Sequence, residues 1–211
     1  MIINIRGTNG SGKTHLARQL IGADAQPVDL VWYDAPTKKA PDRKLSVEGW
    51  GQPDEFFAVG SYKQGCGGMD TIPSFDLQQQ AVLRAARWEG LAGHAPRDIV
   101  CEGVLASTVA GSWLEFFTKL QSTWKGVDPA HYRVLVAYLD TPLELCLERI
   151  TARQIAAKGE AREIKTDLVA NKIRAIEATR EKFKAAGIMT VTLRHGSALS
   201  DLQEALHYGA A

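Results

Sequence analysis

The chain of 211 residues is long enough to bury a substantial core, and its 45% hydrophobic and 23% charged residues are ordinary for a globular protein. Its formal net charge of +1 excludes a global electrostatic attraction to nucleic acid, so any contact with DNA or RNA depends on local basic patches. A solvated loop or helix face is the simpler interpretation of each candidate patch. The candidates are Lys38, Lys39, Arg43 and Lys44 in one stretch, and Lys172, Arg174, Arg180, Lys182 and Lys184 in another.

The cysteines and the apolar segments favour a reducing compartment. Cys66, Cys101 and Cys146 are far apart and lack the C-x-x-C spacing of metal sites, and the last two lie in apolar segments as predicted core residues. The apolar runs are too short to span a membrane. The first strand begins at residue 2 and leads directly into a glycine loop, so we expect no signal peptide and a cytoplasmic location.

The first twenty residues carry the most specific motif in the chain. An apolar strand at residues 2–5 precedes the stretch GTNGSGKT, which matches G-x-x-x-x-G-K-[ST] at every fixed position, and a helix at residues 15–21 follows, with Gly22 as its expected C-cap. Backbone N–H groups of such a loop surround phosphate oxygens. We expect Lys13 to reach the β- and γ-phosphates and Thr14 to bind Mg²⁺. The expected nucleotide-binding residues are Gly7, Thr8, Asn9, Gly10, Ser11, Gly12, Lys13 and Thr14.

The next segments predict two strands, a long loop and a helix. Residues 28–33 read as a buried strand, whereas residues 35–54 lack periodicity and read as a surface loop of functional length. A short strand is predicted at residues 56–62. A tight glycine-rich segment follows at 65–72, and then a helix at 75–91.

The middle of the chain contains a strand that ends in an acid. Residues 98–103 are apolar and close on Glu102 and Gly103, at the strand end that faces ligands in a parallel sheet. Residues 111–124 form a helix with an aromatic stripe, which is usually core, with base stacking as the alternative. The stripe consists of Trp113, Phe116, Phe117, Leu120 and Trp124.

The last third predicts two further strands and three helices. A strand at 132–139 leads to a helix from residue 143, which carries Arg149 and Arg153 on one face. A long helix at 166–186 ends before Gly187, a strand follows at 189–193, and Ser200 with Gln203 suggests a capping box. This alternation predicts an α/β fold with a mainly parallel sheet covered on both faces, and no second domain is visible.

The candidate residues together suit phosphoryl transfer. Glu102 could act as base for an acceptor hydroxyl or hold Mg²⁺ through water, unless it is only a solvent-facing strand terminus. Arg149 and Arg153 could surround the transferring phosphate or simply form a solvated helix face. Asp70 follows three glycines and could approach a substrate closely, or it could cap a turn.

The order of these features resembles the nucleoside and nucleotide kinases. The chain has a phosphate loop, a strand ending Glu-Gly, a strand ending Leu-Asp-Thr-Pro and an arginine-bearing helix. The resemblance implies a three-layer P-loop kinase fold over residues 1–211, with a mainly parallel five-stranded sheet flanked by helices, and the use of ATP and Mg²⁺. It also implies that Glu102 assists the acceptor hydroxyl, and that Arg149 and Arg153 belong to a lid around 149–165.

The stretch at residues 60–72 departs from ordinary nucleotide kinases, in which an arginine-containing monophosphate site is expected. It is more similar to phage-encoded kinases that phosphorylate the hydroxymethyl group of hydroxymethyluracil within DNA. That similarity implies an acceptor-binding insertion around 35–75 and a DNA partner carrying a modified pyrimidine, in a host cytoplasm. The implied acceptor site consists of Tyr62, Gly67, Gly68 and Asp70, with Tyr62 available for stacking.

Three functions remain open from the sequence. The first is a kinase for a hydroxyl on a base in DNA or on a free nucleoside or nucleotide, and the neutral net charge counts mildly against the polymer. The second is a kinase for an unrelated small metabolite. The third is a nucleotide-dependent switch or ATPase, which is weakened because Asn171 and Lys172 are followed by Ile173 and Arg174 and not by the Asn-Lys-x-Asp guanine box.

Overall fold

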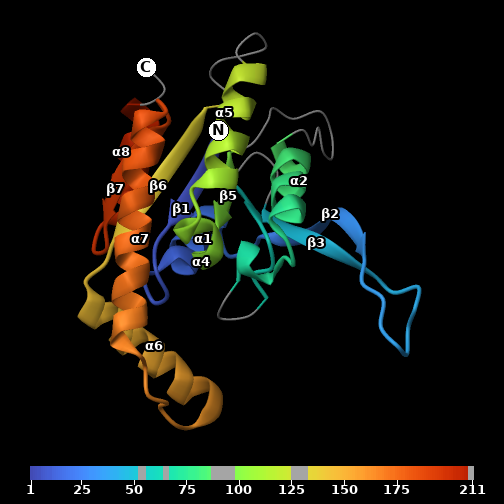
Figure 1. Ribbon diagram of the computed structural model, residues 1–211, viewed down its shortest axis with the longest axis horizontal. Coiled ribbons are helices and arrows are strands. Elements are labelled where there is room, and N and C mark those ends of the chain that lie inside the picture. Colours follow the sequence, from blue (N-terminus) through green and yellow to red (C-terminus); the bar gives the residue numbers. More distant parts are fainter. Residues whose placement is uncertain (52–55, 64–66, 87–97, 125–132, 209–211) are drawn as a thin grey trace.

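The computed structural model describes residues 1–51, 56–63, 67–86, 98–124 and 133–208, excluding the side chains of 123, 124 and 208. Helices and strands alternate along most of this length (Figure 1). In chain order the elements are β1 (Ile2–Arg6), α1 (Lys13–Ile21), β2 (Gln26–Asp34), β3 (Lys44–Gly51), β4 (Phe57–Val59), the 3₁₀ helix η1 (Met69–Thr71), α2 (Phe75–Ala86), β5 (Ile99–Glu102), α4 (Val104–Thr108), α5 (Gly111–Trp124), β6 (Val134–Asp140), α6 (Leu143–Lys158), α7 (Thr166–Ala185), β7 (Met189–Arg194) and α8 (Ala198–Tyr208).

The strands form one mixed sheet of seven strands in the order β2-β3-β4-β5-β1-β6-β7. Strands β4, β5, β1, β6 and β7 run parallel, whereas β3 is antiparallel to both β2 and β4. The expected five-stranded sheet is therefore too small. The sheet is extended at one edge by the β2–β3 hairpin, in which a strand had been expected at 28–33 but β3 had been assigned to a loop.

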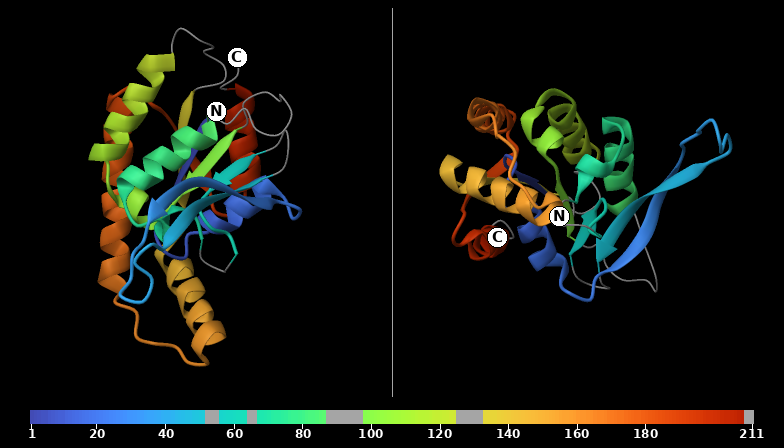
Figure 2. Two further views of the ribbon diagram at one scale, coloured as in Figure 1. Left: turned by 90° about the vertical axis from the view of Figure 1, so that its right-hand side faces the viewer. Right: turned by 90° about the horizontal axis from the view of Figure 1, so that it is seen from below.

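Apolar side chains on both faces of β1 explain its central position. All five of its residues are buried. Ile2 packs into a cluster with residues of α2, α5 and α7, and Ile3 and Ile5 pack into a second cluster with residues of α1 and α8. The helices therefore cover the sheet on both faces (Figure 2). None of the described helices combines the length and the apolar character that a membrane crossing requires.

Helix α6 leaves the body of the protein at the end of the sheet where β1, β5 and β6 terminate (Figure 1). A small separate cluster of Cys146, Ile150 and Val169 joins the first turns of α6 to α7. Beyond Ile150 no residue of α6 is buried. The outer part of this helix therefore has few contacts to hold it in place.

Two expectations for residues 28–54 were wrong. Strand β2 is not a buried strand: Leu30 is buried, but its other side chains are partly buried or exposed, and Trp32 is 61% exposed. Residues 44–51 are not a loop, because β3 pairs with β2 from Lys44 to Gly51 and with β4 at Gly49 to Gly51. The small residues Ser46, Gly49 and Gly51 concealed this strand, since glycine inside a strand is atypical and weakens the alternating pattern.

The aromatic stripe of α5 belongs to the core, as its usual interpretation predicted. Trp113 and Phe117 are fully buried, and Trp113 meets Phe116 edge to face with ring centroids 5.6 Å apart. These rings pack against the sheet and are not free to stack on a base. The side chain of Trp124 lies outside the described residues.

The beginning of α8 differs from expectation, whereas the end of the helix expected at 75–91 is not described. Helix α2 ends at Ala86 among the described residues, and positions 87–91 of the expected helix lie outside them. Helix α8 begins at Ala198, so Ser200 and Gln203 lie inside it and form no capping box. The Ser197 hydroxyl instead donates to the Asp201 carboxylate, which also binds Arg194.

The packing of β3 can be tested by adding one methyl group. A Cβ on Gly49 would lie 2.1 Å from the ring of Phe57, a core residue that is 1% exposed. Gly49→Ala should therefore lower the free energy of unfolding by about 2 kcal/mol through overpacking. The control is Gly111→Ala, where a Cβ would meet nothing within 4 Å. Urea unfolding that shows both variants to be equally stable would contradict the placement of β3 against Phe57.

Candidate active site

The phosphate loop connects β1 to α1 through two glycines with positive φ angles. Gly10 and Gly12 have φ angles of 77° and 101°, which favour glycine strongly. A Cβ on Gly10 would lie 2.4 Å from the backbone oxygen of Cys146 on α6, so the loop packs directly against that helix. The backbone N–H of Gly7 donates to the Ser107 hydroxyl at 3.2 Å. The sequence motif is therefore built into a loop held from two sides.

Lys13 lies across this loop. Its side chain is 6% exposed, and its ammonium donates to the carbonyl of Thr8 at 3.0 Å. Burial lowers the pKa of Lys13, while the nearby carboxylates of Glu102 and Asp70 act in the opposite direction. A cation held this close to the loop is positioned for phosphate oxygens.

Glu102 is the buried carboxylate of the site. It ends β5 next to Ile5 of β1, is 1% exposed, and accepts a hydrogen bond from the Thr14 hydroxyl at 2.9 Å. Burial raises the pKa of Glu102 to about 7, against the opposing effects of Lys13 and Thr14. The alternative that Glu102 is a solvent-facing strand terminus is therefore wrong. Its pKa suits a group that exchanges a proton near neutral pH.

The glycine-rich segment lies directly against this carboxylate. Gly68 has a φ of 75°, and a Cβ there would lie 2.3 Å from Oε1 of Glu102. A Cβ on Gly67 would lie 2.2 Å from the backbone oxygen of Ser61. Ser61 and Gly68 also form an isolated β-bridge. The backbone of this segment can therefore lie directly against Glu102 at the carboxyl end of β5. Gly65 and Cys66 lie outside the described residues.

Asp70 caps the short helix α4, which was one of the two interpretations of its sequence. Its carboxylate oxygens accept hydrogen bonds from the backbone N–H groups of Val104 at 2.7 Å and Leu105 at 3.1 Å. Its charge contributes to raising the pKa of Glu102. Because both of its oxygens are occupied, Asp70 is a weaker candidate base than Glu102.

Tyr62 does not offer an open ring for stacking. It is 5% exposed and packs in the core cluster that contains Ala58 and Val100. Burial, with a further effect of Glu102, raises the pKa of Tyr62 well above its usual range, and its hydroxyl has no hydrogen-bond partner among the described residues. The expectation of base stacking on Tyr62 does not fit this position, because the chain turns back toward α1 after β4.

The first arginine of α6 reaches the phosphate loop. Nη1 of Arg149 donates to the carbonyls of Gly10 at 3.3 Å and Ser11 at 3.4 Å. Arg153 lies close enough to contribute to lowering the pKa of Lys13. Arg149 is exposed on α6, and its guanidinium nevertheless reaches the loop.

Two cations near the loop were not singled out for it in the sequence. Lys172 of α7 donates to the side-chain oxygen of Asn9 at 3.3 Å, although it had been grouped with a surface patch. Arg6 is fully buried beside Gly7, and its guanidinium lies 4.4 Å from the centre of the Phe183 ring. It donates to Asn4 and Thr179 and has no carboxylate partner in the described part of the chain. No local pattern could reveal either contact, since both join residues distant in sequence.

A cavity of about 610 Å³ opens from the loop on the side of α8. Its walls are Ser11 and Gly12 of the loop, the outer face of α1, Arg149, and the turn between β7 and α8 at residues 195–200. This volume is in the range of small-molecule and cofactor sites. The cavity adjoins the phosphate loop at Ser11 and Gly12.

The hydroxyl of Thr14 and the carboxylate of Glu102 are the oxygen donors that would suit Mg²⁺. Within the described ranges, no group of three or more His, Cys, Asp and Glu side chains could hold a metal on its own. This composition fits Mg²⁺, which is commonly held by one or two protein oxygens, water and the phosphates of its nucleotide.

A phosphate loop with a buried lysine, a strand-end carboxylate and an arginine at the loop defines a phosphotransferase site. A family model described as 5-hmdU DNA kinase matches residues 1–198, and the chain belongs to this family. It is therefore a kinase, and the resemblance to phage-encoded kinases is confirmed.

Several phage proteins named 5-hmdU DNA kinase are similar to this chain. The one from Pseudomonas phage M6 is 31% identical over 204 residues, or 95% of each chain. The one from Pseudomonas phage PaMx11 is 31% identical over 208 residues, covering 97% of this chain and 96% of the relative. The one from Bacillus phage SP10 is 29% identical over 188 residues, which is 26% of that longer protein. No solved structure matches the chain.

The contact between Gly68 and Glu102 can be tested against a glycine with a similar φ angle. Gly68→Ala should lower kcat by at least about ten-fold, because the new Cβ would displace the carboxylate. The control is Gly187→Ala, at a φ of 72° with nothing within 4 Å of its Cβ position, which adds backbone strain alone. Equal kcat values in steady-state assays of the two folded variants would contradict the contact.

The pKa of Glu102 predicts a linked effect on stability. Since the folded pKa of about 7 lies above the ordinary value of 4.5, the folded state binds the proton more tightly, and stability falls as pH rises between them. Relative to the unmodified chain, Glu102→Gln should gain about 3 kcal/mol in unfolding free energy from about pH 4.5 to about pH 8. The measurement is urea unfolding without nucleotide or Mg²⁺. A pH-independent difference would show that Glu102 has an ordinary pKa.

Proposed function

We propose that this kinase transfers the γ-phosphate of ATP to the hydroxymethyl oxygen of 5-hydroxymethyluracil within DNA. The observation that carries the proposal is the buried Glu102 carboxylate, which has a pKa of about 7 and lies beside Thr14 and Lys13 at the phosphate loop. Membership of the family supports the acceptor, because its relatives are named for 5-hmdU in DNA.

The loop and the adjoining cavity have complementary roles toward ATP. The loop at residues 7–14 would hold the phosphates with its backbone N–H groups, and the cavity bounded by Arg149 and residues 195–200 would hold the nucleoside. Lys13 would exchange the carbonyl of Thr8 for the β- and γ-phosphate oxygens. Mg²⁺ held by Thr14, with Glu102 in reach through water, would supply charge neutralisation on those phosphates.

Glu102 is the group that removes the acceptor proton. As the hydroxymethyl oxygen forms its bond to the γ-phosphorus, the bond from that phosphorus to the β-phosphate oxygen breaks and ADP leaves. The acceptor proton passes to the carboxylate of Glu102, whose pKa near 7 allows it to release the proton again at neutral pH. Arg149 and Arg153 supply positive charge around the transferring group.

The acceptor base lies against the backbone of Gly67 and Gly68. Because neither residue has a side chain, this segment packs directly against Glu102 and the backbone of Ser61, and Asp70 fixes the beginning of α4 at the same place. A base in a duplex has to be flipped out to reach this position, at a cost of a few kcal/mol. A free hydroxymethylated nucleotide is the competing acceptor, since it would need no flipping.

The acceptor test compares three substrates. Labelled phosphate from ATP should appear on DNA containing hydroxymethyluracil, and not on the same DNA containing thymine. The free nucleotide should be labelled much more weakly than the DNA. Lys13→Ala should abolish transfer while the protein remains folded, because it removes the cation from the β- and γ-phosphates. Efficient labelling of the free nucleotide alone would reject the DNA acceptor.

We also expect α6 and the following loop, from Arg149 to Arg162, to close over bound ATP as a lid. The outer part of α6 is exposed and projects from the body, while Arg149 already reaches the loop. Hydrogen exchange at residues 149–162 should slow when a nonhydrolysable ATP analogue is added, since closure excludes water. Exchange that stays unchanged at saturating analogue would remove the lid.

A further inference from the structure

We propose that the β2–β3 hairpin is a DNA-binding arm, whose tip contacts the phosphate backbone several base pairs away from the target base. This inference rests on the DNA substrate proposed above. The arm comprises residues 26–51, and its basic tip comprises residues 35–44. The argument depends on the direction of the hairpin, its reach and its charge.

The arm is a regular antiparallel ribbon at one edge of the sheet. Its strands pair from Gln26 with Gly51 to Asp34 with Lys44. The turn is ordered by backbone hydrogen bonds between Thr37 and Ala40 and between Ala35 and Arg43. Figures 1 and 2 show the ribbon continuing well beyond the rest of the sheet into solvent. A defined ribbon of this kind is a shape that double-stranded DNA accommodates.

The strand directions place the basic tip on the same side as the active site. Because β3 is antiparallel to β4, and β4 is parallel to β5, the beginning of β3 lies at the carboxyl edge of the parallel strands. Glu102 lies at that same edge. In Figure 1 the arm and α6 leave the body on this side, from opposite parts of the sheet.

The register gives the reach of the arm. Glu48 lies opposite Gly60, whose backbone N–H donates to the Glu48 backbone oxygen. On the next strand Cys101 pairs with Val59, so Glu102 lies at the same level as Gly60 and Glu48. Lys44 is four residues beyond Glu48, which places it about 13 Å past the level of Glu102. It is also two strands away from β5, about 10 Å to the side. The direct separation of about 16 Å corresponds to about five base pairs at 3.4 Å each.

The tip carries a local charge that the whole chain lacks. All four of its basic side chains, at Lys38, Lys39, Arg43 and Lys44, are exposed, and Asp42 is the one acidic residue between positions 35 and 44. The chain as a whole has a net charge of only +1. Trp32 is 61% exposed on the same ribbon, opposite Ser46. A basic tip with an exposed aromatic side chain complements a phosphate backbone.

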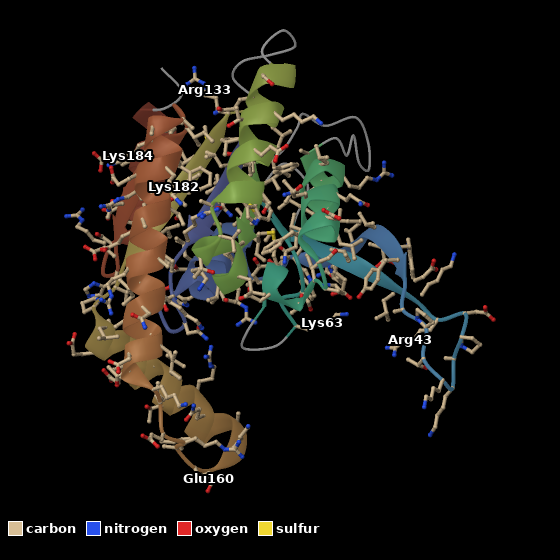
Figure 3. All side chains as sticks on the ribbon, viewed as in Figure 1. Arg43, Lys63, Arg133, Glu160, Lys182 and Lys184 are labelled. Atoms are coloured by element: carbon tan, nitrogen blue, oxygen red, sulfur yellow. The ribbon has the colours of Figure 1, made fainter. Side chains whose placement is uncertain are left out.

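Two lysines of the other basic patch lie at the opposite edge of the sheet. Lys182 and Lys184 are in the last turn of α7, just before the parallel strand β7 begins, so they are at the amino edge of the sheet. Figure 3 shows them across the molecule from Arg43. This pair is therefore a control that has similar charge and exposure without access to the active site.

The test compares Lys38→Ala/Lys39→Ala with Lys182→Ala/Lys184→Ala. For a duplex with one hydroxymethyluracil and flanks of about twelve base pairs, the arm variant should raise KM about ten-fold and reduce the salt slope of binding by about two. Neither kcat nor the KM for ATP should change, and the control variant should match the unmodified chain. With flanks of about three base pairs, short of the arm's reach, the unmodified chain and the arm variant should have equal KM values.

A second readout separates the arm from the proposed acceptor. Fluorescence anisotropy with unmodified duplex measures DNA binding whether or not phosphate is transferred. If the arm variant binds DNA more weakly but the unmodified chain transfers no phosphate to hydroxymethyluracil DNA, the proposed acceptor is rejected and the DNA-binding arm is supported. Binding and salt slope equal to those of the unmodified chain would overturn the arm, whatever the acceptor. Equal loss in the control pair would also overturn it, by showing a diffuse charge effect.

Discussion

The burial of the Glu102 carboxylate against the phosphate loop is the interaction on which the rest of the site depends. β1 and β5 are adjacent parallel strands, so the loop that follows one and the acid that ends the other meet at a single edge. Thr14 donates to Glu102, Lys13 supplies the nearest cation, and burial keeps the pKa of the carboxyl near 7. A group that is costly to ionise in the folded state is thus kept beside the phosphate loop, where the proposed proton transfer would take place.

The surrounding residues hold this arrangement without themselves reacting. Gly68 lets backbone approach the carboxylate, and Asp70 uses both oxygens to fix the beginning of α4 beside it. On the other side of the loop, Arg6 is a buried cation with its pKa lowered to about 10 by desolvation. It has no carboxylate partner in the described ranges and joins β1 to α7 through Thr179. Such a charge adds positive potential next to Gly7, where phosphate would bind.

The proposed ATP site and the proposed acceptor site lie on opposite sides of the phosphate loop. The cavity beside α8 and the arginines of α6 lie on the side of β6 and β7, where ATP is expected. The glycine segment and the hairpin arm lie on the side of β4, β3 and β2, where the acceptor is expected. Glu102 and the loop lie between them, near the middle of the strand order. The antiparallel pair β2–β3 makes this arrangement possible. Antiparallel strands are joined by a short hairpin and need no crossover helix, so the hairpin can extend past the carboxyl edge of the parallel strands.

The sequence by itself determined the phosphate loop, the acid at the end of β5, the core character of the α5 aromatic stripe and the helix that carries Arg149. Each of these is encoded locally, by glycine spacing, periodicity or the end of an apolar run. Only the tertiary structure decided that residues 44–51 form a strand, that Tyr62 is enclosed, that Asp70 is a cap and that Lys172 reaches Asn9. The reason is physical: strand pairing at an edge, burial and contacts between distant residues depend on partners that local patterns do not specify.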